Sequence, residues 1–151
     1  MSGAALLTEA HELIERIQEI EDRESIRELT AMYCKCVVQA DIDAIVDLFT
    51  PDGIMEAGDT HVAGHEKLRA MYDEAMGDLR PLPCVHNHII EVEGDRARGT
   101  CTLELRGVAD GTSQIGAGHY EDEFQRRNGA WKFSHRNLIL YHMVPLSQGW
   151  A

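Results

Sequence analysis

The sequence predicts a single α+β domain, residues 1–151, in which helices come first and an antiparallel sheet follows. Two observations predict this order. Up to about residue 76, apolar residues recur with the i, i+3, i+4, i+7 spacing of amphipathic helices. After Pro83 they alternate with polar residues, as in half-buried strands, and glycine-containing turn sequences separate the alternating segments. A chain of 151 residues fits one domain with its own core.

The helical part is expected to contain four helices. Apolar stripes mark them over residues 13–20, 26–40, 42–49 and 64–76. Asp22 lies between the first two stripes and is expected to cap the second helix. Asp41 is expected to cap the third helix, which ends at the turn sequence Thr50-Pro51-Asp52-Gly53.

Three or four strands are expected after Pro83, with a shorter one before it at residues 53–58. The segments are His86 to Val92, Ala97 to Val108, Gly118 to Arg127, and Trp131 to His142. Asn128-Gly129 is typical of a type I′ hairpin, so the last two strands should be antiparallel neighbours. A curved sheet wrapped round its helices leaves a concave interior, where small ligands usually bind.

The charge balance excludes two classes of partner. The chain has 14 basic and 26 acidic residues, a net charge of −12. It therefore lacks the basic face that nucleic-acid binding and docking on an anionic membrane require. No apolar stretch approaches the ~20 residues of a membrane span, and no signal peptide is expected. The cysteines form no C-x-x-C pair, which favours a reduced cytoplasmic protein with free thiols at Cys34, Cys36, Cys84 and Cys101.

Histidine is the most informative residue type, since five of the eight histidines fall in predicted strands. His86 and His88 are two residues apart and are expected to share one face of a strand. Together with His119 they suggest a metal site, but no fourth ligand can be placed, so no metal is expected. A strand histidine in a partly dry pocket also suits general acid–base catalysis. The surplus of carboxylates is interpreted as solvated surface.

The chain resembles the SnoaL-like branch of the nuclear transport factor 2 (NTF2-like) superfamily over nearly its whole length. The matching segments are Ile26-Arg27-Glu28-Leu29 with Tyr33, Asp41 to Gly53, His86 to Ala97, Tyr120 to Phe124, and Gly129 to Arg136. The resemblance implies a cystatin-like cone, in which N-terminal helices pack in a strongly curved antiparallel sheet that encloses a ligand cavity. It also implies self-association through the exposed face of the sheet, as a homo-dimer or homo-trimer.

The resemblance is greatest to the dehydratase and dehydrochlorinase branch, in which a strand histidine acts as a base and a helix aspartate orients it. On this basis His86 and Tyr33 are the expected catalytic residues. Arg136, Tyr120, His88 and Val38 are expected to contact the substrate. Val38 stands at the position of the family's aspartate, and Asp41, three residues further on, is the alternative source of a carboxylate.

Three functions remain open from the sequence. The first is a lyase or isomerase that needs no cofactor and abstracts a proton from a small cyclic, largely apolar substrate, because preorganised donors suffice to stabilise an enolate. The second is a non-catalytic binding protein that uses the same cavity, since Val38 replaces the acid. The third is an accessory subunit of a ring-hydroxylating dioxygenase, because those subunits share the fold that the resemblance implies.

Overall fold

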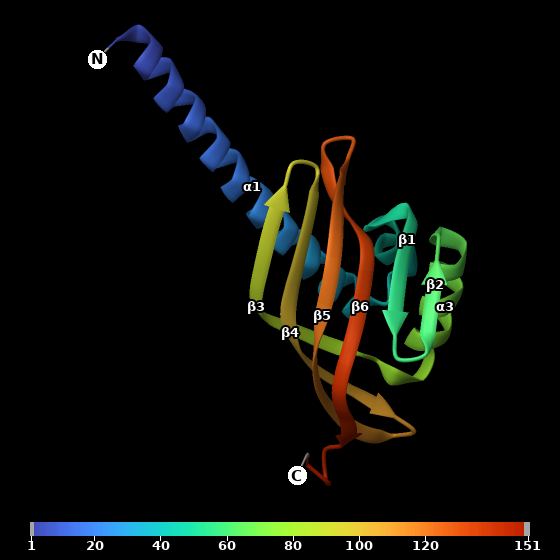
Figure 1. The fold of residues 1–151 in the computed structure, drawn as a ribbon. Helices are drawn as coiled ribbons and strands as arrows, with labels where there is room; N and C mark the ends of the chain where they lie inside the picture. The colour runs from blue at the N-terminus through green and yellow to red at the C-terminus, as the bar shows by residue number, and fades with distance from the viewer. Residues whose placement is uncertain (1, 150–151) are drawn as a thin grey trace.

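A six-stranded sheet curves round the C-terminal half of one long helix (Figure 1). The structure is a computed structural model that describes residues 2–149, with only the backbone of Asp78 described. The elements in chain order are α1 (Gly3–Gln39), α2 (Ile42–Asp47), β1 (Phe49–Ala57), β2 (Thr60–Ala63), α3 (His65–Leu79), β3 (Leu82–Glu93), β4 (Arg96–Ala109), β5 (Thr112–Arg127) and β6 (Ala130–Pro145). As predicted, helices and one short strand, here joined by β2, fill the first half of the chain and the long strands follow.

Helix α1 is continuous, so the expected break at Asp22 is wrong. Asp22 lies in the middle of α1 and is buried, because its carboxylate binds residues of the sheet instead of the helix backbone. Arg126 donates two hydrogen bonds to it, of 2.6 and 2.9 Å, and the Trp131 indole donates a third of 3.1 Å. This cluster fastens the middle of α1 to the β5–β6 hairpin.

The other expected helices are present with small shifts in their ends. Asp41 caps α2 as predicted, since its Oδ1 accepts a hydrogen bond of 3.1 Å from the backbone N–H of Ala44. Helix α3 begins after Gly64, as expected, and continues through Gly77 to Leu79. The expected short strand is the C-terminal part of β1, which begins at Phe49, and β2 was not expected.

The sheet has the strand order β2-β1-β6-β5-β4-β3, in which β3 to β6 form an antiparallel meander and β1 runs parallel to β6. Asn128 and Gly129 both have positive φ, at 51° and 79°, which confirms the predicted type I′ turn between β5 and β6. The long strands therefore lie next to their sequence neighbours, and their inner faces cover α1.

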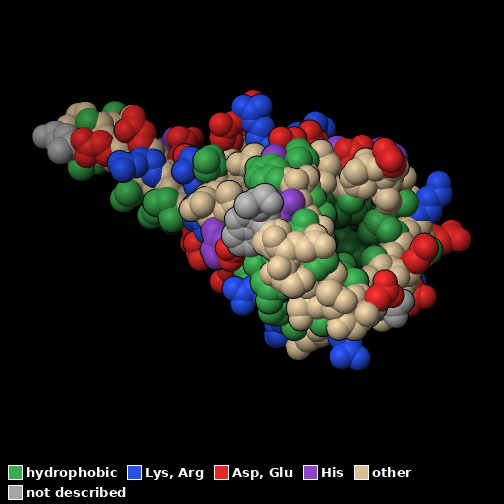
Figure 2. Space-filling model, turned by 90° about the horizontal axis from the view of Figure 1, so that it is seen from below, with side chains coloured by type: hydrophobic (Ala, Val, Ile, Leu, Met, Phe, Trp, Pro, Cys, Tyr) green, Lys and Arg blue, Asp and Glu red, His purple; other side chains and the backbone are tan. Residues whose placement is uncertain are grey.

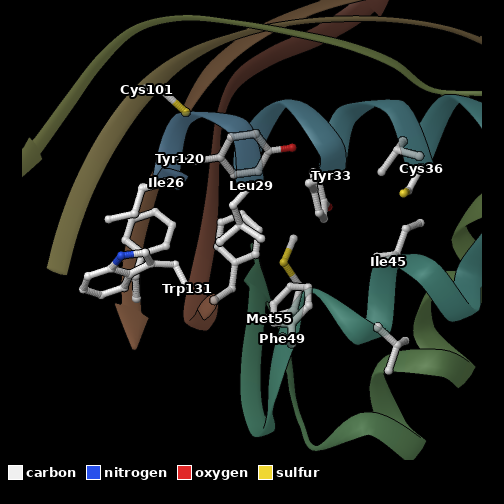
Figure 3. Packing of buried hydrophobic residues seen from close by; sticks show 14 of the residues in the cluster. Ile26, Leu29, Tyr33, Cys36, Ile45, Phe49, Met55, Cys101, Tyr120 and Trp131 are labelled. Carbon is white, nitrogen blue, oxygen red and sulfur yellow. The ribbon is translucent and has the colours of Figure 1, made fainter. Parts of the chain in front are cut away.

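The hydrophobic core lies between α1 and the concave face of the sheet (Figure 3). Ile26, Leu29, Tyr33 and Cys36 follow one face of α1 toward the sheet, and strand residues such as Tyr120 meet them. Within residues 2–149, no helix is both long and apolar enough to cross a membrane. Packing in the core thus buries one face of α1 and the concave face of the sheet.

We expect Asp22→Asn to lower the free energy of unfolding by about 2 kcal/mol at pH 7, the value of a charge-assisted hydrogen bond. Burial alone would raise the pKa of Asp22, but hydrogen bonds from Arg126, Trp131 and Gln18 lower it below its ordinary value of about 3.9. The contribution of Asp22 is therefore present above about pH 4 and is lost as the pH falls through the lower folded-state pKa.

Urea unfolding of wild type and variant between pH 7 and pH 2 measures this difference, which should shrink toward the acid end. Glu19→Ala is the matched control, because the Glu19–Arg23 ion pair lies exposed one turn away on the same helix. An equal loss in both variants would show that Asp22 does not fasten α1 to the sheet.

Candidate functional site

A fully buried ion pair lies at the centre of the interior. Arg136 on β6 and Asp122 on β5 are directly opposite each other on neighbouring antiparallel strands. Neither side chain has any exposed surface. Nη2 of Arg136 donates a hydrogen bond of 3.2 Å to Oδ2 of Asp122, and Nε lies 3.1 Å from Oδ1. Burial raises the pKa of Asp122 to about 6, although the guanidinium opposes this shift.

Aromatic rings enclose the guanidinium of Arg136. Its central carbon lies 3.6 Å from the ring centroid of Tyr120, 4.2 Å from that of Tyr33 and 4.4 Å from that of Phe133. Such contacts stabilise a desolvated cation through the negative faces of the rings. Despite the burial, the attraction of Asp122 keeps the pKa of Arg136 raised. Arg136 is therefore charged at all ordinary pH values.

Tyrosine hydroxyls add neutral polar groups to this interior. The hydroxyls of Tyr33 on α1 and Tyr72 on α3 lie 2.9 Å apart and share a hydrogen bond. Burial raises the pKa of both phenols and of Tyr120, so all three stay protonated at neutral pH. The interior thus offers O–H donors beside one cation.

A β-bulge on β6 directs Arg136 inward. Phe124 pairs with Phe133 and Glu123 with His135, so Ser134 has no partner on β5. Phe133 and Arg136 are three residues apart, which would place them on opposite faces of a regular strand. The extra residue shifts the alternation, and both side chains point into the core.

A second bulge, on β3, separates the two histidines that were expected to share a face. His86 pairs with Thr102 and Ile89 with Thr100, so Asn87 and His88 together oppose Cys101, and Asn87 has a φ of 52°. The expectation of a shared face is therefore wrong, because alternation is interrupted between the two residues.

His86 lies on the outer face of the sheet, with 53% of its side chain exposed and Nε2 3.6 Å from Oε2 of Glu104. His88 is half-buried, and its Nε2 is buried without a hydrogen-bond partner in the described part of the chain. Burial, with help from the charges of Arg136 and Arg27, lowers the pKa of His88 to about 4. His88 is thus a neutral imidazole at pH 7.

The helix position expected for the family's acid is not in the core. Val38 is 52% exposed near the end of α1. Asp41, the alternative carboxylate, is exposed and caps α2. The structure thus brings Tyr33, Tyr120 and Arg136 together, and leaves His86 and Val38 apart from them.

The suggested metal trio is also dispersed. His119 lies on the outer face of β5, where its Nδ1 is 2.7 Å from the Tyr141 hydroxyl and its Nε2 is 3.3 Å from Glu121. Among residues 2–149, no three His, Cys, Asp or Glu side chains are arranged to hold a metal ion.

The underside of the body is hollowed, and hydrophobic side chains line the hollow (Figure 2). This is the end where β3 begins and β6 ends. A groove of about 380 Å³ on the opposite, convex face of the sheet is different in character, since Glu91, Arg98, Glu121 and Glu123 line it. The hollow is the concavity whose chemistry suits an apolar ligand.

Sequence reasoning missed Asp122 and Tyr72 at this site. The interpretation of the carboxylates as solvated surface is wrong for Asp22 and Asp122, which are both buried. A signal for Asp122 was present, because it alternates with Tyr120 and Phe124, two residues that belong on the inner face of a strand. No comparable signal marks Tyr72, which α3 brings to Tyr33 from 39 residues away.

The fold defines the class of protein as NTF2-like with a cystatin-like architecture, as solved structures of similar shape show. An NTF2-like protein from Novosphingobium aromaticivorans is 28% identical, with a TM-score of 0.72 and coverage of 85% of this chain and 88% of the other. A hexachlorocyclohexane dehydrochlorinase is 21% identical, with a TM-score of 0.80 and coverage of 87% and 93%. A candidate scytalone dehydratase from N. aromaticivorans is 17% identical, with a TM-score of 0.78 and coverage of 84% and 89%.

Within that class, the chain belongs to the SnoaL-like domain family, whose model matches residues 18–137. No curated protein matches the chain. The predicted family and fold class are thus confirmed. The match begins within α1 and ends one residue after Arg136, so it includes both partners of the buried ion pair.

We expect Arg136→Met and Asp122→Leu each to lower the free energy of unfolding by about 3–5 kcal/mol, because each leaves one buried charge without its partner. The double variant should be more stable than either single variant, since it removes both charges together. Urea unfolding of the three variants measures this. A loss in the double variant equal to the sum of the single losses would contradict a mutually dependent pair.

Proposed function

We propose that the protein binds a small, largely apolar cyclic molecule in the hollow beneath the sheet. The hydrophobic lining of that hollow carries the proposal (Figure 2). Membership of the SnoaL-like family and the shared cone fold support it. Binding is favoured over catalysis by a histidine–aspartate dyad, because His86 lies on the outer face and the acid position holds an exposed valine.

The interior polar groups suit a ligand that carries an oxygen atom. Nη1 of Arg136 is buried without a hydrogen-bond partner in the described part of the chain, and the Tyr33 and Tyr72 hydroxyls remain protonated. A carbonyl or hydroxyl oxygen of the ligand would accept from these donors. Tyr120 would then contact the ring of the ligand.

A second candidate function is a cofactor-free lyase or isomerase. The neutral imidazole of His88 favours it, because a general base must be unprotonated at working pH. Proteins of the same fold include a dehydrochlorinase and a candidate scytalone dehydratase. In this chain the base would be His88 rather than His86, and Tyr33 would donate to the developing oxyanion. A pKa of about 4 makes His88 a weak base, so turnover would be slow.

We propose that the protein works in the cytoplasm, where its four cysteines would stay reduced. All four are free thiols in the structure.

We also propose self-association through the outer face of the sheet as a dimer or trimer. Ile89 and Tyr141 support this, because they expose 66% and 64% of their surface there.

Calorimetric titration with a panel of cyclic ketones, phenols and their parent hydrocarbons tests the binding function. We expect micromolar or tighter affinity for at least one oxygen-bearing compound. Tyr33→Phe should lower the affinity for that compound about tenfold, the value of one hydrogen bond, and should leave the affinity for its parent hydrocarbon unchanged. An equal loss of affinity for both compounds, or no binder in the panel, would contradict the proposal.

Product analysis by mass spectrometry tests the catalytic candidate. If a bound compound is converted, His88→Gln should reduce the rate at least 100-fold, the usual contribution of a general base, whereas His86→Gln should change it little. These two variants are matched, because they make the same change two residues apart on opposite faces of β3. Loss of turnover in His86→Gln alone would place the base on the outer face.

A further inference from the structure

The N-terminal half of α1 projects away from the body as a free arm (Figure 1). We define the arm as residues 3–21. None of its side chains is buried, and the first buried residue of α1 is Asp22. The arm is about 28 Å long at 1.5 Å per residue. It therefore presents five turns of helix to solvent.

Large aliphatic side chains form a stripe along this arm. Their exposed fractions are between 47% and 74%, and they are Leu6, Leu7, Leu13, Ile14, Ile17 and Ile20. Leu6, Ala10, Leu13, Ile17 and Ile20 follow the alternating four- and three-residue spacing of a heptad seam, and Leu7 and Ile14 widen it. A stripe of this width is typical of a helix packed against another helix.

The stripe cannot be covered by the arm's own domain. At 100° per residue, its centre lies roughly 150° round the helix from the face that contacts the sheet, which includes Ile26, Leu29 and Tyr33. Bending α1 toward the sheet would therefore leave the stripe in water. Most helices in proteins owe their stability to packing of an apolar face, so the apolar face of the arm calls for a partner.

The exposed area fits a second copy of the same helix. Six side chains at these exposures present several hundred Å² of apolar surface per copy, more than isolated monomers usually expose in one patch. A stable interface needs about 800 Å² per partner, which the flanking polar side chains of two paired helices would complete. A pair of arms thus reaches the size of a stable dimer interface.

Charge permits an antiparallel pair and disfavours a membrane. When Leu13 of one arm packs on Ile17 of the other, Glu9 at one edge of the stripe falls beside Arg23 of the second copy, and the symmetric contact repeats it. These two opposite-charge contacts outnumber the single like-charge contact of Arg16 with its own counterpart. The arm carries five glutamates and one arginine, so an anionic lipid surface would repel it. Antiparallel pairing also keeps the two bodies at opposite ends.

We propose that the arm is a homodimerisation element, in which the arms of two copies pair antiparallel through the Leu13–Ile17 stripe. This interface is separate from the outer face of the sheet and does not depend on the function of the hollow. It would hold two domains apart with their hollows free.

Light scattering after size exclusion, at tens of micromolar, tests the proposal with two double variants of the full chain. Leu13→Glu with Ile17→Glu should halve the mass relative to wild type. Thr8→Glu with His11→Glu adds the same charges on the opposite side of the arm and should leave the mass unchanged. Because no side chain of the arm is buried, near-UV circular dichroism should be unaltered in both. Equal masses in all three proteins would overturn the proposal.

A charge exchange tests the antiparallel register. Glu9→Arg alone and Arg23→Glu alone should each raise the dimer dissociation constant several-fold, because each places like charges together. The protein with both changes should recover the wild-type constant. Absence of recovery would contradict the antiparallel register. A membrane role for the stripe would give a different pair of results. The wild type, but not the Leu13→Glu, Ile17→Glu variant, would co-sediment with anionic vesicles, and the two proteins would have the same mass by light scattering. That outcome would overturn the dimer.

Discussion

The buried pair of Arg136 and Asp122 is the interaction on which the rest of the interior depends. Taking both charges out of water is costly, and the cost is offset only while the guanidinium keeps its carboxylate and its aromatic surroundings together. Tyr33 and Tyr120 are therefore more than core filling, because they hold the cation between α1 and the sheet. Burial, together with the charges of Arg136 and Arg27, lowers the pKa of His88 and keeps that imidazole neutral.

Two bulges decide which side chains take part. The bulge at Ser134 turns Arg136 inward beside Asp122, and the bulge at Asn87 turns His88 inward and His86 outward. Each inserts one residue into one strand, which exchanges the faces of everything beyond it. The positions of Arg136 and His88 in the interior are thus set by these two local irregularities of the sheet.

The order of elements, the hairpin at Asn128-Gly129 and the Asp41 cap could be predicted, because each depends on nearby residues and on local turn or cap geometry. Asp22 was misplaced because a carboxylate within a helix resembles a cap until its partners, 104 and 109 residues away, are known. The bulges could not be foreseen, since no residue type uniquely marks them. Asp122 was recoverable from its alternation with aromatic residues.

The β3 bulge places His88, and not His86, in the interior, where the charge of Arg136 acts on it. A pH titration of the histidine ring nitrogens by NMR, with His88→Gln for assignment, tests it most directly. The His88 imidazole should stay neutral until about pH 4. A midpoint near the ordinary value of about 6.5 would instead place His88 in solvent, outside the interior.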